Sequence, residues 1–487
     1  MNETTSISKK TKYTYAMSGM GRDMMYTLYS TYLLVFFTDV IGVSNWELIA
    51  VGTIIAVARI WDAINDPMMG IIIDNTHTRF GKFKPWILIG ALTSAICFFL
   101  LFQDFGLSGT AFVVVFAILY VLSGMTFTMN DIAYWSMYPS FTTDPREREK
   151  IGSLARVFAS LGMFITIAFV PIFYQDLYPG TPKEAFTVLA GGIGLIFIIS
   201  QILIFINVKE HKNPITKAKQ VNTKFKDILK VIFKNDQLVV IIVAIFLFNT
   251  GYFITTALGI YFFNYDFNKY GGVEFMLFSI ILAVSQLSAL ILFPFLAKKM
   301  TRKKIFGIAI LMISVGYALF LSVGNILPQN MIFVGLAGFV LFSGEGFIQV
   351  LVLCMLADTT EYGQWKLGTR NESVVFAINP FMVKLATSVQ TIIVAATLAV
   401  SGLNEFVINP VQAATEADPN ISTEAIRALI AANVTDEMLL MLRTSMVVIP
   451  FILIMISYVI YRWKFKIDTK MYQQITEDLL KRVENQE

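Results

Sequence analysis

The chain of 487 residues is 56% hydrophobic and only 15% charged, and its mean hydropathy is +0.66. A water-soluble protein has about 25% charged residues, and its surface could not keep 42 Phe and 19 Tyr side chains away from water. The composition therefore excludes a soluble protein and predicts an all-α, multi-pass membrane protein. Cys97 and Cys354 both lie in apolar runs, which argues against a disulfide framework or a thiolate metal site.

Apolar windows of about 20 residues, long enough to cross a bilayer, recur in two sets of six. The first set covers about 13–42, 46–74, 85–103, 110–137, 152–174 and 185–208. The second set covers about 237–264, 272–298, 304–325, 331–357, 374–402 and 441–461. A polar, Lys-rich stretch separates them. The pattern predicts twelve transmembrane helices in two six-helix bundles, 1–208 and 237–487, joined by a linker at 209–236.

The distribution of cations predicts the orientation of the spans. With a cytoplasmic N-terminus, the inner segments hold 30 Lys and Arg and the outer segments hold 4. This asymmetry places both termini in the cytoplasm and explains the net charge of +4 without a nucleic acid partner. The first apolar run is too long for a cleavable signal peptide. We expect one long external loop, 403–440, with short surface helices at Thr423–Ala432 and Asp436–Leu442.

Several ionisable residues fall inside predicted spans, where a charge is expensive unless it faces a cavity, a partner or a substrate. Asp62 and Asp66 are four residues apart, so both lie on one helix face beside Asn65. Two such carboxylates cannot both stay charged in a low dielectric unless a cation or a proton joins them. This face is therefore a candidate site for a monovalent metal ion or H⁺, held by Asp62 and Asp66. The alternative is that internal salt bridges with Arg59 and Lys384 hold helices together.

A second polar group lies in the fourth span, where Asp131 and Trp135 are also four residues apart. A carboxylate can accept two sugar hydroxyls, and an indole can stack on a pyranose ring. Asp23 in the first span would add an acceptor, and Arg22 and Arg156 would add forked donors. The pattern favours a sugar site, although Trp135 alone could also be an interfacial anchor near the end of its span.

A long polar motif runs from Asp66-Pro67-Met68-Met69-Gly70 to Lys84-Pro85-Trp86. It contains Asp74 and the cations Arg79, Lys82 and Lys84, which mark a tight cytoplasmic turn into the third span. We expect these residues to have a gating role, with Arg79 paired to Asp74 or to helix C-termini.

This motif resembles the signature of the glycoside–pentoside–hexuronide:cation symporters, a branch of the major facilitator superfamily (MFS). The similarity extends from about residue 12 to residue 465 and looks closest to the sodium/melibiose symporter type. Five further stretches support it: Gly21-Arg22-Asp23, Ala58 to Asp66, Gly124 to Asp131, Arg146-Glu147-Arg148-Glu149, and Ala357-Asp358 with Tyr362-Gly363. The resemblance implies the MFS fold and cation-coupled symport by alternating access.

The resemblance also implies roles for individual residues. It implies that Asp62, Asn65, Asp66, Thr128 and Lys384 bind the cation. Similarly, it implies that Arg22, Asp23, Asp131, Trp135 and Arg156 bind the sugar. The chain departs from the melibiose type at Asn379-Pro380, Gln349 and Glu345, so melibiose itself is not implied; Asn379 is included among the candidate sugar residues.

The expected function is secondary active transport of a glycoside or oligosaccharide in the plasma membrane, coupled to Na⁺, Li⁺ or H⁺. We expect a monomer surrounded by membrane lipid, with no cofactor, no catalytic residue and no enzymatic activity. An MFS carrier of a non-sugar substrate, such as a lipid–cation or a drug–proton transporter, is the main alternative. A membrane enzyme or a channel is disfavoured, because the sequence has neither a catalytic motif nor a sign of a continuous pore.

Overall fold

The computed structural model describes residues 7–142, 144–179, 181–208, 232–267, 270, 273–418 and 421–484, and nearly all of them are helical. The first six long helices are α1 (Lys9–Val35), α2 (Asn45–Asp74), α3 (Lys84–Leu101), α4 (Gly109–Met137), α5 (Pro145–Ile172) and α6 (Pro182–Asn207). The later long helices are α8 (Asp236–Tyr261), α9 (Val273–Lys299), α10 (Arg302–Ser322), α11 (Met331–Leu367), α12 (Glu372–Val400) and α15 (Asp436–Lys464). Each predicted span therefore corresponds to one long helix.

Local sequence signals account for several helix starts. Ser44 and Glu47 form a capping box at the start of α2, and Thr181 and Glu184 do the same for α6. α5 begins at Pro145, where the missing N–H costs nothing because the first turn has no partner for it.

The predicted boundaries are least accurate for α11. The prediction ended this helix at residue 357, where the apolar run stops, but the helix continues to Leu367. The added turns carry polar side chains such as Asp358 and Glu361, both of which are buried. Hydropathy could not reveal this extension, because the polar groups are satisfied by ion pairs with other helices.

Among the described residues, ten helices are long and apolar enough to cross a membrane. α1 is not among the ten, because polar and charged residues such as Arg22 and Asp23 interrupt its apolar sequence, and in α2 the stretch Ile49–Arg59 counts as a shorter apolar helix. These two helices still have the length for a span, with 27 and 30 residues.

The chain divides into two compact units. Unit 1 comprises Met1–Val239, Leu353–Phe381 and Ile467–Glu487, and unit 2 comprises Val240–Val352 and Met382–Lys466. The end of α11 and the start of α12 therefore belong with the first six helices. Most of the predicted linker, 209–231, lies outside the described residues, and the predicted domain limits stay a prediction.

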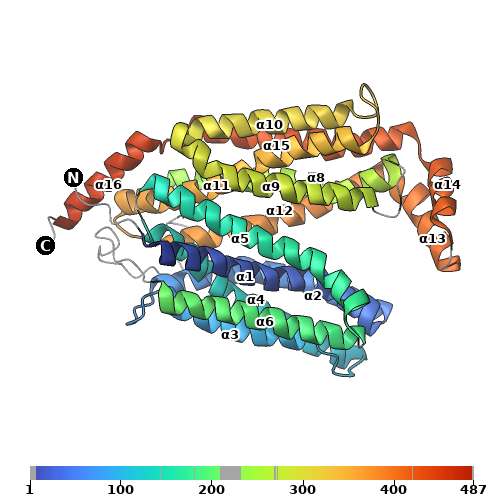
Figure 1. Ribbon diagram of the computed structural model, residues 1–487, viewed down its shortest axis with the longest axis horizontal. Coiled ribbons are helices and arrows are strands. Elements are labelled where there is room, and N and C mark those ends of the chain that lie inside the picture. The colour runs from blue at the N-terminus through green and yellow to red at the C-terminus, as the bar shows by residue number, and fades with distance from the viewer. Residues whose placement is uncertain are drawn as a thin grey trace. The chain divides into compact units, whose positions relative to one another are not determined.

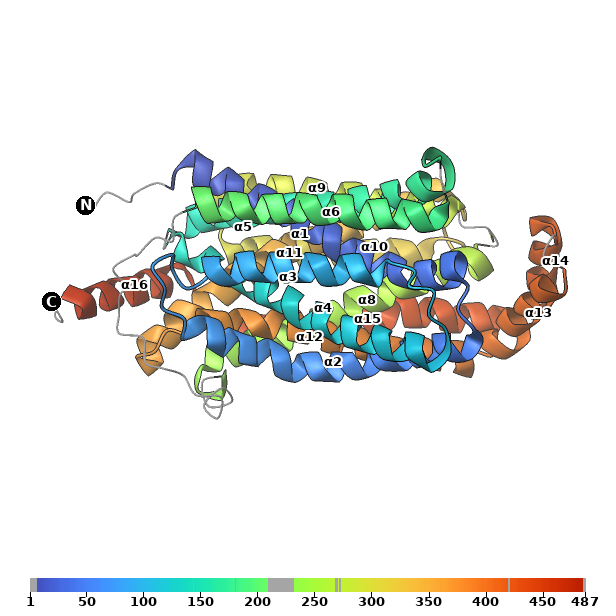
Figure 2. The same ribbon diagram turned by 90° about the horizontal axis from the view of Figure 1, so that it is seen from below.

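Within unit 1, α1 packs along α5 and α6, α3 packs against α4 and α6, and α2 packs against α4 (Figures 1 and 2). Glycines allow the closest approaches. A Cβ added at Gly90 on α3 would lie 2.5 Å from the backbone nitrogen of Asn130 on α4. These contacts fix α4 beside α2 and α3, and α1 beside α5.

Unit 2 has its own packing, with α10 against α15, and it carries the long segment between α12 and α15. Two short helices, α13 (Asn409–Ala417) and α14 (Thr423–Asn433), lie beyond the end of α15 (Figure 1). The helix predicted at 423–432 is confirmed. The separate helix predicted at 436–442 is wrong, because these residues are the first turns of α15, where Thr435 caps the helix. α16 (Thr469–Glu484), which belongs to unit 1, was not predicted from the sequence.

Candidate binding site and charge network

The predicted cation site lies on the face of α2 that packs against α4. Asp66 is 1% exposed and accepts a hydrogen bond from the Oγ1 of Thr128 on α4, at 3.0 Å. Asp62, one turn earlier, lies beside Gly124 of α4, where an added Cβ would be 3.4 Å from its Oδ1. Two carboxylates of α2 and one hydroxyl of α4 thus lie along one helix contact.

Asn65 completes this group with a buried amide. Its Nδ2 has no hydrogen-bond partner among the residues that the structure describes. A buried polar atom of this kind is costly, so its position needs a reason. Carboxylate, amide and hydroxyl oxygens are hard ligands that suit a monovalent cation, and the carboxylates also suit a proton. Lys384 lies on α12 in unit 2, and its place in the cation site stays a prediction.

The predicted sugar residues of α1, α4 and α5 form a second cluster in unit 1. The guanidinium of Arg22 on α1 forms ion pairs with Asp131 of α4 and, at 2.8 Å, with Asp23 of α1. The side chain of Arg22 is 4% exposed, whereas those of Asp23 and Asp131 are 22% and 19% exposed. The carboxylates therefore remain accessible to a ligand while the cation between them is covered.

Two guanidinium groups lie against the ring of Trp135 in the same cluster. Its ring centroid is 4.8 Å from the Cζ of Arg22 and 4.6 Å from the Cζ of Arg156, and the residue is buried. This environment argues against the interfacial-anchor interpretation, since an anchor has its ring at the lipid boundary. The adjacent Tyr134 stacks on Tyr15 of α1 at 4.4 Å between ring centroids, which holds α1 against α4.

α4 contributes to both groups. Thr128, which contacts Asp66, is three residues before Asp131, which contacts Arg22. Residues three apart lie on neighbouring positions of one helix face. The two candidate sites therefore share a rigid element. The remaining candidate sugar residue, Asn379, lies half-buried on α12 in unit 1, and its role stays a prediction.

A third polar cluster, called here the charge network, consists of Asp74, Lys82, Arg148, Asp358, Glu361, Arg370 and Glu372. Arg148 of α5 is fully buried, and its Nη1 is 3.1 Å from Oδ1 of Asp358 on α11. Its Nη2 is 2.9 Å from Oε1 of Glu361 and donates to the carbonyl oxygen of Thr142 at 2.9 Å. Arg148 thus joins the start of α5 to the end of α11.

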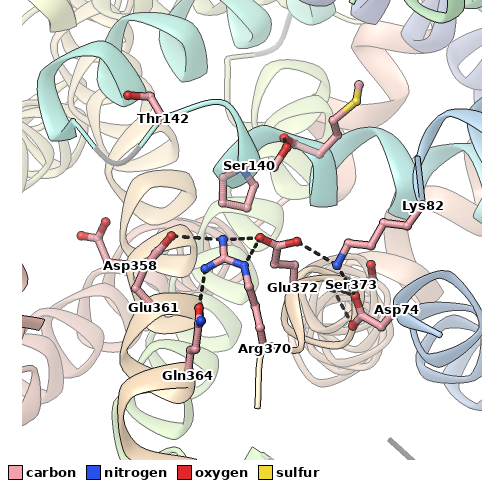
Figure 3. A network of polar contacts seen from close by, with 12 residues as sticks. Asp74, Lys82, Ser140, Thr142, Asp358, Glu361, Gln364, Arg370, Glu372 and Ser373 are labelled. Atoms are coloured by element: carbon pink, nitrogen blue, oxygen red, sulfur yellow. Dashed lines mark hydrogen bonds and ion pairs between the residues drawn. The ribbon is translucent and has the colours of Figure 1, made fainter. Parts of the chain in front are cut away.

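The network continues across the connection between α11 and α12 (Figure 3). Arg370 contacts Glu361 at 3.3 Å, donates to Oε1 of Gln364 at 2.8 Å, and forms an ion pair with Glu372. Glu372 in turn is 2.9 Å from Nζ of Lys82.

Asp74 ends the network at the N-terminus of α12. It is 3.1 Å from Nζ of Lys82, and it accepts hydrogen bonds from the backbone N–H groups of Ser373 at 3.0 Å and Val374 at 3.2 Å. A helix N-terminus favours an anion, because its first N–H groups have no partners within the helix. Four carboxylates are thus balanced by three side-chain cations and one helix N-terminus.

The two network cations outside the helices stay charged. Burial by itself would lower the pKa of Lys82, but Glu372 and Asp74 outweigh burial and the pKa lies above the usual value. Burial has the same effect on Arg370, and Glu372 and Glu361 again raise its pKa.

The structure corrects one detail of the predicted gating motif. Lys82, and not Arg79, is the cation that pairs with Asp74. Arg79 is exposed, with its Cζ 4.7 Å from the ring centroid of Phe80. Lys84 lies 5.2 Å from the ring centroid of Phe205.

No function was predicted from the sequence for five residues of the charge network: Arg148, Asp358, Glu361, Arg370 and Glu372. The sequence did contain a signal for three of them. Arg148 and Asp358 fall in stretches that carry the family resemblance, and Glu361 directly precedes Tyr362-Gly363, which is part of the same resemblance. Which acid pairs with which base depends on helices that are more than 200 residues apart in sequence.

Comparison with known proteins supports the resemblance. The sequence profile described as MFS/sugar transport protein matches residues 14–469. The chain is 30% identical to the lactose permease of Leuconostoc lactis, over 96% of this chain and 71% of that protein. It is 32% identical to the raffinose carrier protein of Pediococcus pentosaceus, over 80% of this chain and 62% of that protein. It is 29% identical to the isoprimeverose transporter of Lactiplantibacillus pentosus, over 83% and 82% of the two chains.

Solved structures show the same fold at low sequence identity. A bacterial homologue of the iron transporter ferroportin, in an outward-facing state, matches with a TM-score of 0.60 and 16% identity, over 93% of this chain and 98% of that one. The MFS proton:xylose symporter XylE matches with a TM-score of 0.58 and 14% identity, over 94% of this chain and 96% of that one. From its profile, its relatives and its fold, the chain belongs to the MFS/sugar transport protein family and is a multi-pass integral protein of the plasma membrane, as the resemblance to the glycoside–pentoside–hexuronide:cation symporters implied.

Proposed function

We propose that this protein is a secondary active transporter that moves a glycoside or short oligosaccharide together with one monovalent cation by alternating access. The cation binds Asp62 and Asp66, assisted by Asn65, Thr128 and Lys384. The sugar hydroxyls bind Asp23 and Asp131. Arg22, Trp135, Arg156 and Asn379 complete the sugar site. The protein acts as a carrier, not an enzyme, and works as a monomer in the lipid bilayer.

The observation that carries this proposal is the position of Thr128 and Asp131 on one face of α4. The hydroxyl of Thr128 binds Asp66 at 3.0 Å, and Asp131 pairs with Arg22 one turn further along the same helix. A cation that neutralises Asp66 changes the contacts of Thr128, and α4 transmits the change directly to the sugar site.

Coupling then follows from linkage. If the cation raises the affinity for the sugar by some factor, the sugar raises the affinity for the cation by the same factor. An inside-negative membrane potential adds about 2.3 kcal/mol per charge per 100 mV, which drives accumulation of the sugar.

The charge network supplies the gate in this proposal. With twelve spans and cytoplasmic termini, the network lies on the cytoplasmic side, where its ion pairs hold α11 and α12 against α5 and α2. Opening the site to the cytoplasm requires these pairs to separate. The buried position of Arg148 and the contacts of Asp74 with the N-terminus of α12 support a closed gate on this side.

The relatives guide the choice of substrate. The relatives above are named for lactose, raffinose and isoprimeverose, and all three sugars are short oligosaccharides. We therefore favour a di- or trisaccharide over a monosaccharide. Two accessible carboxylates with a covered guanidinium suit a ligand rich in hydroxyl groups, and this favours a sugar over the lipid or drug substrates of other MFS carriers.

The proposal can be tested with purified protein in liposomes. Uptake of a panel that includes lactose, raffinose and isoprimeverose is measured with an imposed Na⁺, Li⁺ or H⁺ gradient, each applied separately. We expect accumulation of at least one glycoside above equilibrium with one of these gradients, and no accumulation without a gradient. The proposal is overturned if no glycoside binds or accumulates while lipids or organic dyes do.

A further inference from the structure

Glu345 of α11 is the least compensated ionisable residue that the structure describes in unit 2. Its exposed fraction is 0%, and neither carboxyl oxygen has a hydrogen-bond partner among the described residues. The contrast with the acids of the charge network is large, since each of those faces a cation or N–H donors.

Three helices surround Glu345. The glycines on either side of it hold α11 close to two of them: a Cβ at Gly344 would lie 2.6 Å from the carbonyl oxygen of Ala309 on α10, and one at Gly346 would lie 2.9 Å from the Cβ of Ala289 on α9. Glu345 also interacts electrostatically with Tyr252 of α8 and Tyr317 of α10. These contacts hold the backbone of α11 on both sides of Glu345 close to α9 and α10.

The ionisable groups that face Glu345 cannot neutralise its charge. Tyr252 and Tyr317 are phenols, and no Lys, Arg or His acts on Glu345 in the described part of unit 2. The hydroxyl of Tyr317 is already engaged with Oγ1 of Thr255 at 2.7 Å. A buried carboxylate without a cation or a donor is strongly disfavoured, and such a group takes up a proton instead.

We propose that Glu345 is a proton-binding site in unit 2, separate from the cation site of α2, and that it releases its proton only when a conformational change admits water. On release, the O–H bond of the carboxylic acid breaks, the proton passes to water, and the carboxylate remains.

The proton site itself does not depend on the proposed function, whereas its effect on sugar exchange does. If the transporter cycle includes deprotonation of Glu345, the exchange rate depends on pH through this one group. The Glu345→Gln variant keeps the shape of the side chain and mimics the protonated acid. It should therefore keep its fold and lose that part of the pH dependence.

The first measurement is infrared difference spectroscopy of the full-length protein in lipid between acidic and alkaline buffer. We expect a carbonyl band of a protonated carboxylic acid in the wild type that is missing in Glu345→Gln. The control is Glu437→Gln, which changes an exposed carboxylate of the same unit and should leave the band unchanged. A band of equal strength in Glu345→Gln and the wild type, or no such band in the wild type at any pH, overturns the proton site.

The second measurement is glycoside exchange in liposomes at a series of pH values. We expect the wild-type rate to fall above the apparent pKa of the site by up to about tenfold per pH unit, with a flat profile for Glu345→Gln. Equal profiles for both proteins overturn the role in transport. Failure of the proposed function gives a different result: the infrared band is present and lost in Glu345→Gln, but no glycoside is exchanged by either protein.

Discussion

The charge network and the sugar cluster are both built from buried ions within unit 1, yet they differ in how those ions are balanced. In the network, each carboxylate has a cation or a helix N-terminus against it, and Arg148, Glu361 and Glu372 are at most 1% exposed. In the sugar cluster, one covered Arg22 serves two carboxylates that remain about one fifth exposed. The two regions therefore differ in whether their acids are fully buried and paired, as in the network, or remain accessible around a covered base, as in the sugar cluster.

The largest expected effect tests the network as a structural lock. Arg148→Ala leaves Asp358 and Glu361 buried without their main cation, which should lower the free energy of unfolding by about 3–5 kcal/mol. Thermal unfolding in detergent measures the loss. The control is Lys150→Ala on the same helix, whose surface pair with Glu147 should contribute less than about 1 kcal/mol. Similar shifts for both variants would contradict the distinction between the network and surface pairs.

The next effect separates the sugar cluster from the network. Asp131→Asn keeps the shape of the side chain but removes a charge-assisted contact with Arg22 and an acceptor for the sugar. Glycoside binding should weaken roughly 100-fold, or about 2–3 kcal/mol. Calorimetric titration measures the affinity, and thermal unfolding serves as the control. A variant that binds normally would remove Asp131 from the site.

The cation site should show a smaller loss that is confined to coupling. Asp66→Asn removes the charge that holds the cation near Thr128, so the variant should lose uphill accumulation, which the membrane potential drives with about 2.3 kcal/mol per 100 mV. Downhill exchange of sugar should stay within about threefold of the wild type, which corresponds to a change of less than about 1 kcal/mol. Equal accumulation by the variant and the wild type under the same gradient refutes the assignment.

A packing change tests how closely α2 must approach α12 for the network to form. A Cβ at Gly70 would lie 2.9 Å from the carbonyl oxygen of Ser373, so Gly70→Ala should force the two helices apart. We expect a loss of about 1–3 kcal/mol in stability. Gly52→Ala on the same helix, where an added Cβ meets nothing within 4 Å, is the matched control. If the two substitutions have equal effects on thermal unfolding, close contact at Gly70 does not matter.

The smallest expected effect concerns pH. Because the acids around Lys82 raise its pKa, its contribution to stability is complete below the usual lysine pKa of about 10.4. That contribution is lost only as the pH rises through the higher value in the folded protein. The difference in unfolding temperature between wild type and Lys82→Met should therefore be constant from about pH 6 to pH 9. A difference that shrinks across this interval would show that Lys82 titrates there.

Most of the fold could be predicted because a bilayer imposes a length and an apolar composition on each helix. The prediction was weakest where polar residues extend a helix, as in the last turns of α11, and where an amphipathic segment lies outside the apolar runs, as in α16. In both places, tertiary partners satisfy side chains that hydropathy assigns to water. Asp478 of α16, for example, accepts a hydrogen bond from Nε1 of Trp365 at 3.1 Å.

Sequence alone determined the membrane class, the helices and the acidic face of α2, since four-residue spacing places Asp62 and Asp66 together in any helix. It also brought Asp131 and Trp135 onto one face of α4. Only the tertiary structure decided that Lys82 takes the place expected for Arg79, that two arginines lie against the ring of Trp135, and that Glu345 has no ionic partner among the residues that the structure describes. Local spacing fixes neighbours on the same helix, but the pairing of charges depends on which helices meet, and that is set by close backbone contacts between residues far apart in the chain.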